Sequence, residues 1–167
     1  MIVFATVGAV GQTSFAAHLG TSLFRYEQAY LVTGVTVLSA LDDQMELSVA
    51  ADFGIATQET ESGTVSPEFL IPVTVGLNFT FPSDPTTFYL GIGIVPAANL
   101  APGRSDAFRL YLGPFAKAGL RVKVHTVMSA FLEAEQQLLF GGPNWVNTGT
   151  EIAAGIHFSF PGRSTDE

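Results

Sequence analysis

Cysteine is absent from the 167 residues, which excludes disulfides and thiolate metal sites. Charge is scarce as well, because Asp, Glu, Lys and Arg together make up only 13% of the chain, about half of the share in ordinary soluble domains. Seven residues are basic and fifteen are acidic, a balance that argues against a nucleic-acid-binding surface. A surface with so little charge is expected to face something other than water.

Long apolar runs are also missing. After the N-terminal segment no uninterrupted apolar stretch reaches about 18 residues, so membrane-spanning helices are not expected. The mean hydropathy is nevertheless positive. A closed β-barrel is the other structure that can cross a bilayer, because all its backbone amides are paired with one another.

The two ends of the chain differ in character from the part between them. Residues 1–11, MIVFATVGAVG, are apolar and end in small residues. They fit either the remnant of a signal peptide, although its positive n-region is missing, or an extension of the first strand. Residues 12–161 form the predicted barrel, and residues 162–167 form a polar tail.

What the sequence does contain is alternation with a period of two, the signature of strands. From Phe108 to Val124 the even positions carry no charge, whereas the odd positions carry four basic residues. The second predicted strand is apolar on both faces, so its orientation is the least well determined of the eight. The pattern predicts eight strands, at residues 13–26, 29–41, 45–56, 68–81, 88–95, 108–124, 127–140 and 151–160.

The connections between these strands differ in length. The second, fourth and sixth are short, as is the first, whereas the others are longer, at residues 58–67, 96–107 and 141–149. In an up-and-down meander, alternate connections lie at the same end. The sequence therefore predicts an all-β, eight-stranded antiparallel up-and-down transmembrane barrel, with the tight turns and both termini at one end and the long loops at the other.

The two faces of the strands indicate which side is outside. One face carries rows of Phe, Leu, Ile and Val, which match a lipid-facing band, whereas the other is small and polar, as a narrow interior requires. A soluble lipocalin-like barrel with the apolar face inside is the alternative architecture. Aromatic residues fall at two levels that predict girdles at the membrane boundaries: Phe79, Phe81, Phe88, Phe158 and Phe160 near the turns, and Tyr30, Phe69, Phe108 and Phe140 near the loops.

The last predicted strand ends in Gly155-Ile-His-Phe-Ser-Phe160, which resembles the C-terminal signal of bacterial outer-membrane proteins. It departs from that signal at Ala153, where a polar residue is usual, and in the tail that follows Phe160. From Gln12 to Phe160 the chain is similar to the small eight-stranded outer-membrane barrels of the OmpA/OmpX class. The resemblance implies an outer-membrane location with both termini in the periplasm, contact with outer-membrane lipids, and recognition by the barrel-assembly machinery through Gly155, Phe158 and Phe160.

The interior of an eight-stranded barrel is only wide enough for its own side chains, and charges buried there must pair. We expect a plugged lumen in which Arg121 pairs with Glu133 or Glu135, and a narrow channel is the alternative. The predicted network of inward charges comprises Arg109, Lys117, Arg121, Lys123, Glu133, Glu135, Glu46, Asp52 and Glu151.

Catalytic and metal chemistry are not expected. His125, Ser129 and Glu133 are the residues that a lipid-modifying enzyme would use, but residues four apart in a strand are about 13 Å apart. His18 and His157 lie on the inward face and are expected to be hydrogen-bonded rather than to bind a metal. We therefore expect neither a cofactor nor a metal site, and a structural or surface-interaction role for the three long loops, with an unknown partner.

Overall fold

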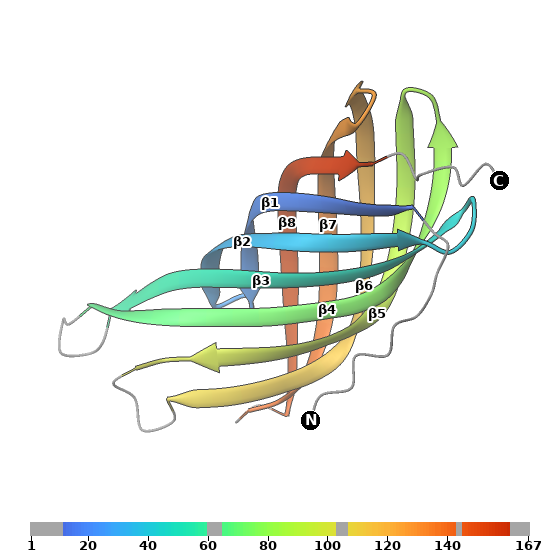
Figure 1. The fold of residues 1–167 in the computed structure, drawn as a ribbon. Helices are drawn as coiled ribbons and strands as arrows, with labels where there is room; N and C mark the ends of the chain where they lie inside the picture. Colours follow the sequence, from blue (N-terminus) through green and yellow to red (C-terminus); the bar gives the residue numbers. More distant parts are fainter. Residues whose placement is uncertain (1–11, 60–64, 103–106, 143–144, 161–167) are drawn as a thin grey trace, which may run out of the picture.

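The computed structural model describes residues 12–59, 65–102, 107–142 and 145–160, and these form one closed antiparallel barrel (Figure 1). The segments predicted as a signal remnant, 1–11, and as a polar tail, 162–167, lie outside the described residues. The eight strands follow one another around the barrel in sequence order: β1 Thr13–Phe24, β2 Gln28–Ala40, β3 Met45–Glu59, β4 Val65–Ser83, β5 Thr86–Leu100, β6 Phe108–His125, β7 Met128–Gly141 and β8 Val146–Ser159.

The predicted number, type and order of strands are confirmed, but several strands are longer than expected. β5 continues to Leu100, which is paired with Phe69 and with Phe108. β8 already begins at Val146, opposite Phe140. Backbone pairing continues there despite the turn-forming composition, so the expected loops 58–67, 96–107 and 141–149 are partly strand.

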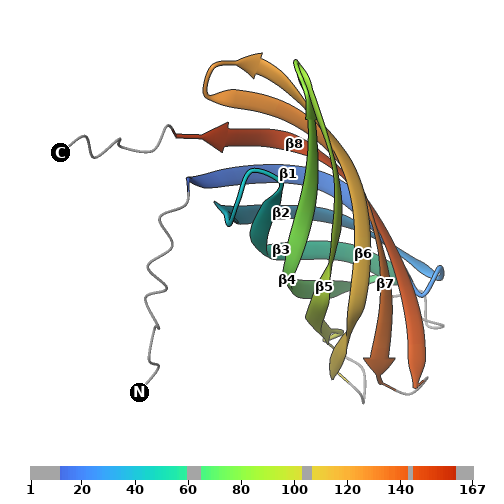
Figure 2. The ribbon, with the colours of Figure 1, turned by 90° about the vertical axis from the view of Figure 1, so that its right-hand side faces the viewer.

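The two ends of the barrel differ as the sequence predicted. The tight connections after β2, β4 and β6 lie together at what we call the turn end (Figure 2). The pairing of Ser14 with Ser159 brings the start of β1 and the end of β8 to this end as well. The opposite end, where β3, β5 and β7 finish, is called the loop end below.

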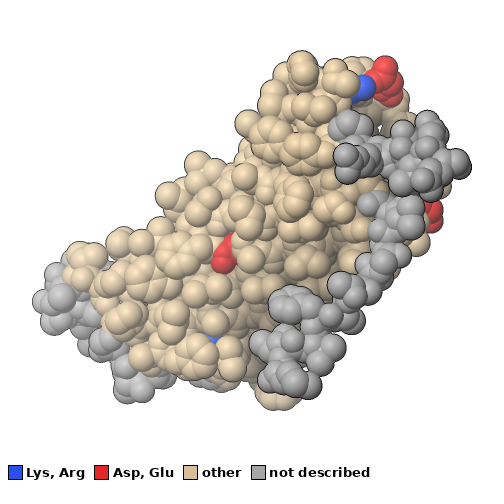
Figure 3. All heavy atoms as spheres, in the orientation of Figure 1, with Lys and Arg blue, Asp and Glu red and all other residues tan. Residues whose placement is uncertain are grey.

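The apolar side chains point outward. Leu19 on β1 and Ile92 on β5 are 58% and 56% exposed, and outward residues of the other strands are similar. The face seen in Figure 3 is almost free of charge, with isolated charged side chains on a continuous uncharged surface. This arrangement is opposite to that of a soluble barrel with an apolar interior. Among the described residues, no helix is long and apolar enough to span a bilayer.

The aromatic side chains of the predicted girdles lie on the outer surface with one exception. Phe81 and Phe88 contact each other near the turn end, with ring centroids 6.0 Å apart, and Phe108 is exposed at the loop end. Tyr30 was predicted to belong to the second girdle, and this is wrong: its side chain is 0% exposed because its position on β2 points into the lumen.

Candidate functional site

The loop-end half of the lumen is packed with apolar and aromatic side chains, which we call the apolar layer. Its members all point inward and are buried: Phe24, Tyr30, Val32, Leu70, Val95, Tyr111 and Leu139. The Phe24 ring meets those of Tyr30 and Tyr111 edge to face, with centroids 6.3 Å and 5.1 Å apart. Just beyond it, the Asn99 amide donates hydrogen bonds to the Tyr30 hydroxyl and to Glu68. The sequence analysis did not predict this layer.

The turn-end half of the lumen is charged. Arg121 on β6 reaches across the barrel to Glu46 on β3, and its two terminal nitrogens donate to the two carboxylate oxygens at 2.8 Å and 2.7 Å. The guanidinium also lies 4.6 Å from the centre of the Tyr89 ring. Both ends of this ion pair are largely buried, so the pair connects opposite walls of the barrel through its interior.

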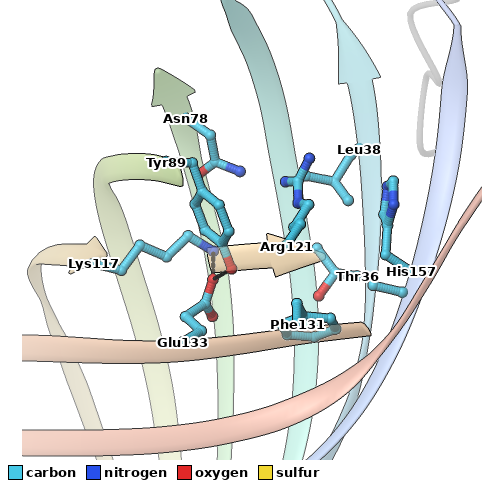
Figure 4. A pocket seen from close by; sticks show the side chains of 10 residues that line it. Thr36, Leu38, Asn78, Tyr89, Lys117, Arg121, Phe131, Glu133 and His157 are labelled. Carbon is cyan, nitrogen blue, oxygen red and sulfur yellow. Dashed lines mark hydrogen bonds and ion pairs between the residues drawn. The ribbon is translucent and has the colours of Figure 1, made fainter. Parts of the chain in front are cut away.

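A second charged group lies beside the first (Figure 4). Lys117 on β6 forms an ion pair with Glu133 on β7 at 3.1 Å, and the Tyr89 hydroxyl donates to the same carboxylate at 2.8 Å. Figure 4 shows Lys117 and Tyr89 converging on Glu133, with Arg121 and Asn78 nearby. Each carboxylate of these two groups therefore has a cationic partner.

Little free volume remains between these side chains. The cavity that they border, together with Thr36, Phe131 and His157, measures about 20 Å³, room for about one water molecule. A wider hollow of about 280 Å³ opens at the turn end, where Arg121, Lys123 and His157 line it with the β4–β5 turn. Among the described residues, the lumen is therefore narrow between these side chains and wider at its turn-end mouth.

The ion pair predicted between Arg121 and Glu133 or Glu135 is wrong, although all three side chains face the lumen. In the register between β6 and β7, Arg121 stands opposite Phe131, whereas Lys117 stands opposite Glu135. Glu133 stands opposite Gly119, two residues from both Lys117 and Arg121, and it pairs with Lys117, whereas the long Arg121 side chain extends to β3. Lys117 takes the place that the sequence analysis gave to Arg121.

The other predicted members of the charge network lie at different levels of the barrel. Lys123 is exposed at the turn end, so its assignment to the buried network is wrong. It lies beyond the level at which β5 and β6 enclose the lumen. Arg109 faces inward at the loop end, opposite Asn99. Glu135, Asp52 and Glu151 are buried in the middle of the lumen.

The two inward histidines have separate surroundings. The His157 ring shares a hydrogen bond of 2.8 Å with the Ser14 hydroxyl, across the β1–β8 seam. His18 lies 3.0 Å from an oxygen of Asp52 and 4.0 Å from an oxygen of Glu151. His18 is therefore among carboxylates rather than beside the other histidine.

The residues considered for lipid-modifying chemistry are not brought together. His125 is exposed at the end of β6, and Ser129 stands opposite Lys123. The Glu133 carboxylate is bound by Lys117 and Tyr89. A nucleophile, a base and an orienting acid in mutual hydrogen-bond reach are required for covalent catalysis, and these three residues do not provide them.

Besides the apolar layer, sequence reasoning missed two interior features, Tyr89 and the His18 cluster. Glycines at the facing positions of neighbouring strands could have indicated both features. Gly119, opposite Tyr89, has no side chain where a Cβ would overlap the tyrosine ring. Gly34 stands between His18 and Asp52 in the register, and a Cβ there would overlap the Asp52 carboxylate. An inward glycine between two large polar residues of neighbouring strands indicates that their side chains meet above it.

The chain matches no protein-family model and no curated protein sequence. Solved structures do resemble it. Neisserial surface protein A superimposes with a TM-score of 0.72 at 12% identity, covering 90% of this chain and 97% of that one. The outer-membrane protein OprG from Pseudomonas aeruginosa gives 0.62 at 9% identity, covering 89% and 96%.

A third similar structure is the attachment invasion locus protein Ail of Yersinia pestis in complex with the heparin analogue sucrose octasulfate. It superimposes with a TM-score of 0.59 at 13% identity, over 90% of this chain and 99% of that one. These likenesses span whole barrels on both sides. The chain therefore has the fold of the small eight-stranded outer-membrane β-barrels.

Proposed function

We propose that this protein is an integral outer-membrane barrel with a closed lumen, without enzymatic activity, whose role is structural or depends on contacts made by its loop end. The observation that carries the proposal is the reversal of the usual soluble pattern, with apolar side chains outside and paired charges inside. A continuous apolar outer surface is stable in lipid and is an aggregation hazard in water.

The packing of the interior supports a closed lumen rather than a channel. The apolar layer fills the loop-end half with side chains that lack charge, and the charged half leaves a cavity of only about 20 Å³. An ion that crossed the apolar layer would lose its hydration without finding compensating partners. The charged residues therefore serve to fill and brace the barrel.

The loop end supports a surface role. Trp145, directly before β8, is 76% exposed there, and exposed tryptophans beside a membrane commonly anchor in its interface. The similar protein Ail was solved with a heparin analogue bound. We extend to this chain only the idea that residues 58–67, 96–107 and 141–149 contact a partner at the cell surface.

Placement in the outer membrane also implies assembly by the barrel-assembly machinery, with both termini in the periplasm. The end of β8 supports this through Gly155, Phe158 and Phe160, of which the two phenylalanines are exposed on the outside. Gly155 has a packing role as well, since a Cβ there would overlap the backbone oxygen of Ala17.

Refolding into lipid vesicles tests the membrane placement. We expect the urea-denatured chain to fold with a β-sheet circular dichroism spectrum and to float with phosphatidylcholine vesicles. Ile92→Arg, in the middle of the outer surface, should destabilise the barrel by about 2–4 kcal/mol, whereas Val124→Arg, near the turn end, should cost about 0–1 kcal/mol. A wild-type chain that stays folded, soluble and monomeric without lipid or detergent would overturn the proposal.

A further inference from the structure

One polar cluster in the lumen has no lysine or arginine of the described residues paired with it. It is formed by His18 on β1, Asp52 on β3 and Glu151 on β8, and we call it the seam cluster because it spans the β8–β1 closure. The His18 Nε2 lies 3.0 Å from Asp52 Oδ1 and 4.0 Å from Glu151 Oε1, and the three ligand atoms are all within 4.8 Å of one another. The His18 and Asp52 side chains are each 6% exposed.

The backbone register builds this cluster. His18 stands opposite Gly34 on β2, and Gly34 in turn stands opposite Asp52 on β3. A Cβ at position 34 would overlap the Asp52 carboxylate and lie 2.7 Å from the His18 Nε2. The missing side chain of Gly34 therefore lets a histidine and a carboxylate from non-adjacent strands approach each other.

Two polar atoms of the cluster make no hydrogen bond, although they lie 3.0 Å from each other. Within the described part of the chain, His18 Nε2 and Asp52 Oδ1 are buried and make no hydrogen bond. Lys117 stands opposite Glu135, close to this level of the lumen, but its ion pair is with Glu133, and Arg121 pairs with Glu46. Buried carboxylates with few cationic partners are costly, so a bound cation would stabilise the cluster.

A neighbouring acid strengthens this need. Glu135 on β7 is the register partner of Glu151 and is itself buried, with Gln137 donating a hydrogen bond to it. Like charges directly opposite each other on neighbouring strands are destabilising. Three buried carboxylates therefore meet at this level around a single histidine.

The donor set selects the kind of cation. One imidazole nitrogen and two carboxylate oxygens suit first-row transition metals better than Mg²⁺ or Ca²⁺, which prefer oxygen alone. In a tetrahedral Zn²⁺ site with bonds of about 2.0–2.2 Å, neighbouring ligand atoms lie about 3.3 Å apart. The two contacts of His18, at 3.0 Å and 4.0 Å, lie on either side of that separation.

We propose that His18, Asp52 and Glu151 bind one divalent transition-metal ion of the Zn²⁺ type inside the barrel, where it ties β1, β3 and β8 together across the closing seam. A metal that binds the folded state and not the unfolded one stabilises the fold. The inference depends on the barrel interior alone, and it does not require the proposed surface role.

The test uses the full chain, folded in detergent micelles after metal removal. Because the lumen is closed, Zn²⁺ is added either to the folded barrel or during folding, and bound metal is counted by elemental analysis after dialysis. We expect one Zn²⁺ per chain and a higher unfolding temperature, whereas Mg²⁺ and Ca²⁺ at the same concentration leave that temperature unchanged. Absence of bound Zn²⁺ by both routes would overturn the proposal.

Variants separate this site from adventitious binding. Asp52→Asn and Glu151→Gln each remove a ligand and a buried negative charge, so they should fold at least as well as the wild type without metal. Removing a residue that only hydrogen-bonds to a metal ligand typically lowers metal affinity about 10–100-fold. Removing a ligand itself should therefore lower Zn²⁺ affinity at least about 100-fold. His157→Gln and His125→Gln change the other two histidines and should leave Zn²⁺ affinity unchanged.

A glycine pair provides a check that removes no ligand. Gly34→Ala places a methyl group between His18 and Asp52 and should weaken Zn²⁺ binding. Gly54→Ala, on the same inner face of β3, places its methyl group 3.3 Å from Leu70 and should leave Zn²⁺ binding intact. The proposed site would be contradicted if Asp52→Asn and Glu151→Gln bound Zn²⁺ as tightly as the wild type. It would also be contradicted if His157→Gln lost as much Zn²⁺ affinity as these two variants.

Discussion

The two halves of the barrel interior are filled by different kinds of interaction. At the loop end, Tyr30, Leu139 and their apolar neighbours are buried against one another. At the turn end, Arg121 with Glu46 and Lys117 with Glu133 form ion pairs across and along the wall. The first half depends on packing without directional partners, whereas the second depends on the presence of both members of each pair.

The two halves of the interior should therefore tolerate substitutions differently. A truncated side chain in the apolar layer leaves a cavity, and its cost depends on how far the surroundings collapse. A truncated partner in the charged half leaves a buried charge, and no collapse can remove that. Substitutions of similar size should therefore cost more in the charged half, except where both partners are replaced together.

The largest effect is expected for Arg121→Met. It leaves the Glu46 carboxylate largely buried without its bidentate partner, which should cost about 3–5 kcal/mol. Urea unfolding in lipid vesicles, followed by tryptophan fluorescence, measures the loss. The matched double variant Arg121→Met with Glu46→Leu should recover most of it. If the double variant is no more stable than the single one, the ion pair is not what braces this half.

In the apolar layer, Leu139→Ala should cost about 2–4 kcal/mol, because Leu139 is fully buried. Its chain neighbour Leu138 points outward and is 39% exposed, so Leu138→Ala is the matched control for the same chemical change on the other face. The same urea titration compares the two. Equal losses would mean that the inward and outward faces of β7 are packed equally well, against the description given above.

The smallest effect distinguishes two buried tyrosines, one in each half. The Tyr89 hydroxyl donates to the charged Glu133, so Tyr89→Phe should cost about 1.5–3 kcal/mol. The Tyr111 hydroxyl is buried and makes no hydrogen bond to any described residue, so Tyr111→Phe should be neutral or stabilising. A greater loss in Tyr111→Phe than in Tyr89→Phe would reverse the comparison between the halves.

The wall of the barrel was predictable because it follows from the chain alone. Alternation along each strand separates residues such as Leu110 and Tyr111 onto opposite faces, and the lengths of the connections place the turns at one end. β2 was ambiguous because its inward residues Tyr30 and Val32 belong to the apolar layer and are as apolar as the outward ones. A period of two cannot distinguish two faces of the same polarity.

The contents of the lumen were only partly predictable. Most of the inward charges were identified, but the partner of Arg121 was not, because Glu46 lies three strands away and is reached across the barrel. Such contacts depend on the stagger of the strands and on side-chain length, which a single sequence does not contain. The same reason concealed the seam cluster, whose residues belong to β1, β3 and β8.

Ion conductance across a planar lipid bilayer measures whether the lumen is closed. With the refolded wild-type barrel inserted, as verified by protease protection in parallel vesicles, we predict a current that stays at the baseline of the bare bilayer. In the closed lumen proposed above, the apolar layer and the charged half would each block the path of a hydrated ion. Discrete conductance steps from the wild-type protein that change in Arg121→Met or Leu139→Ala would contradict this account.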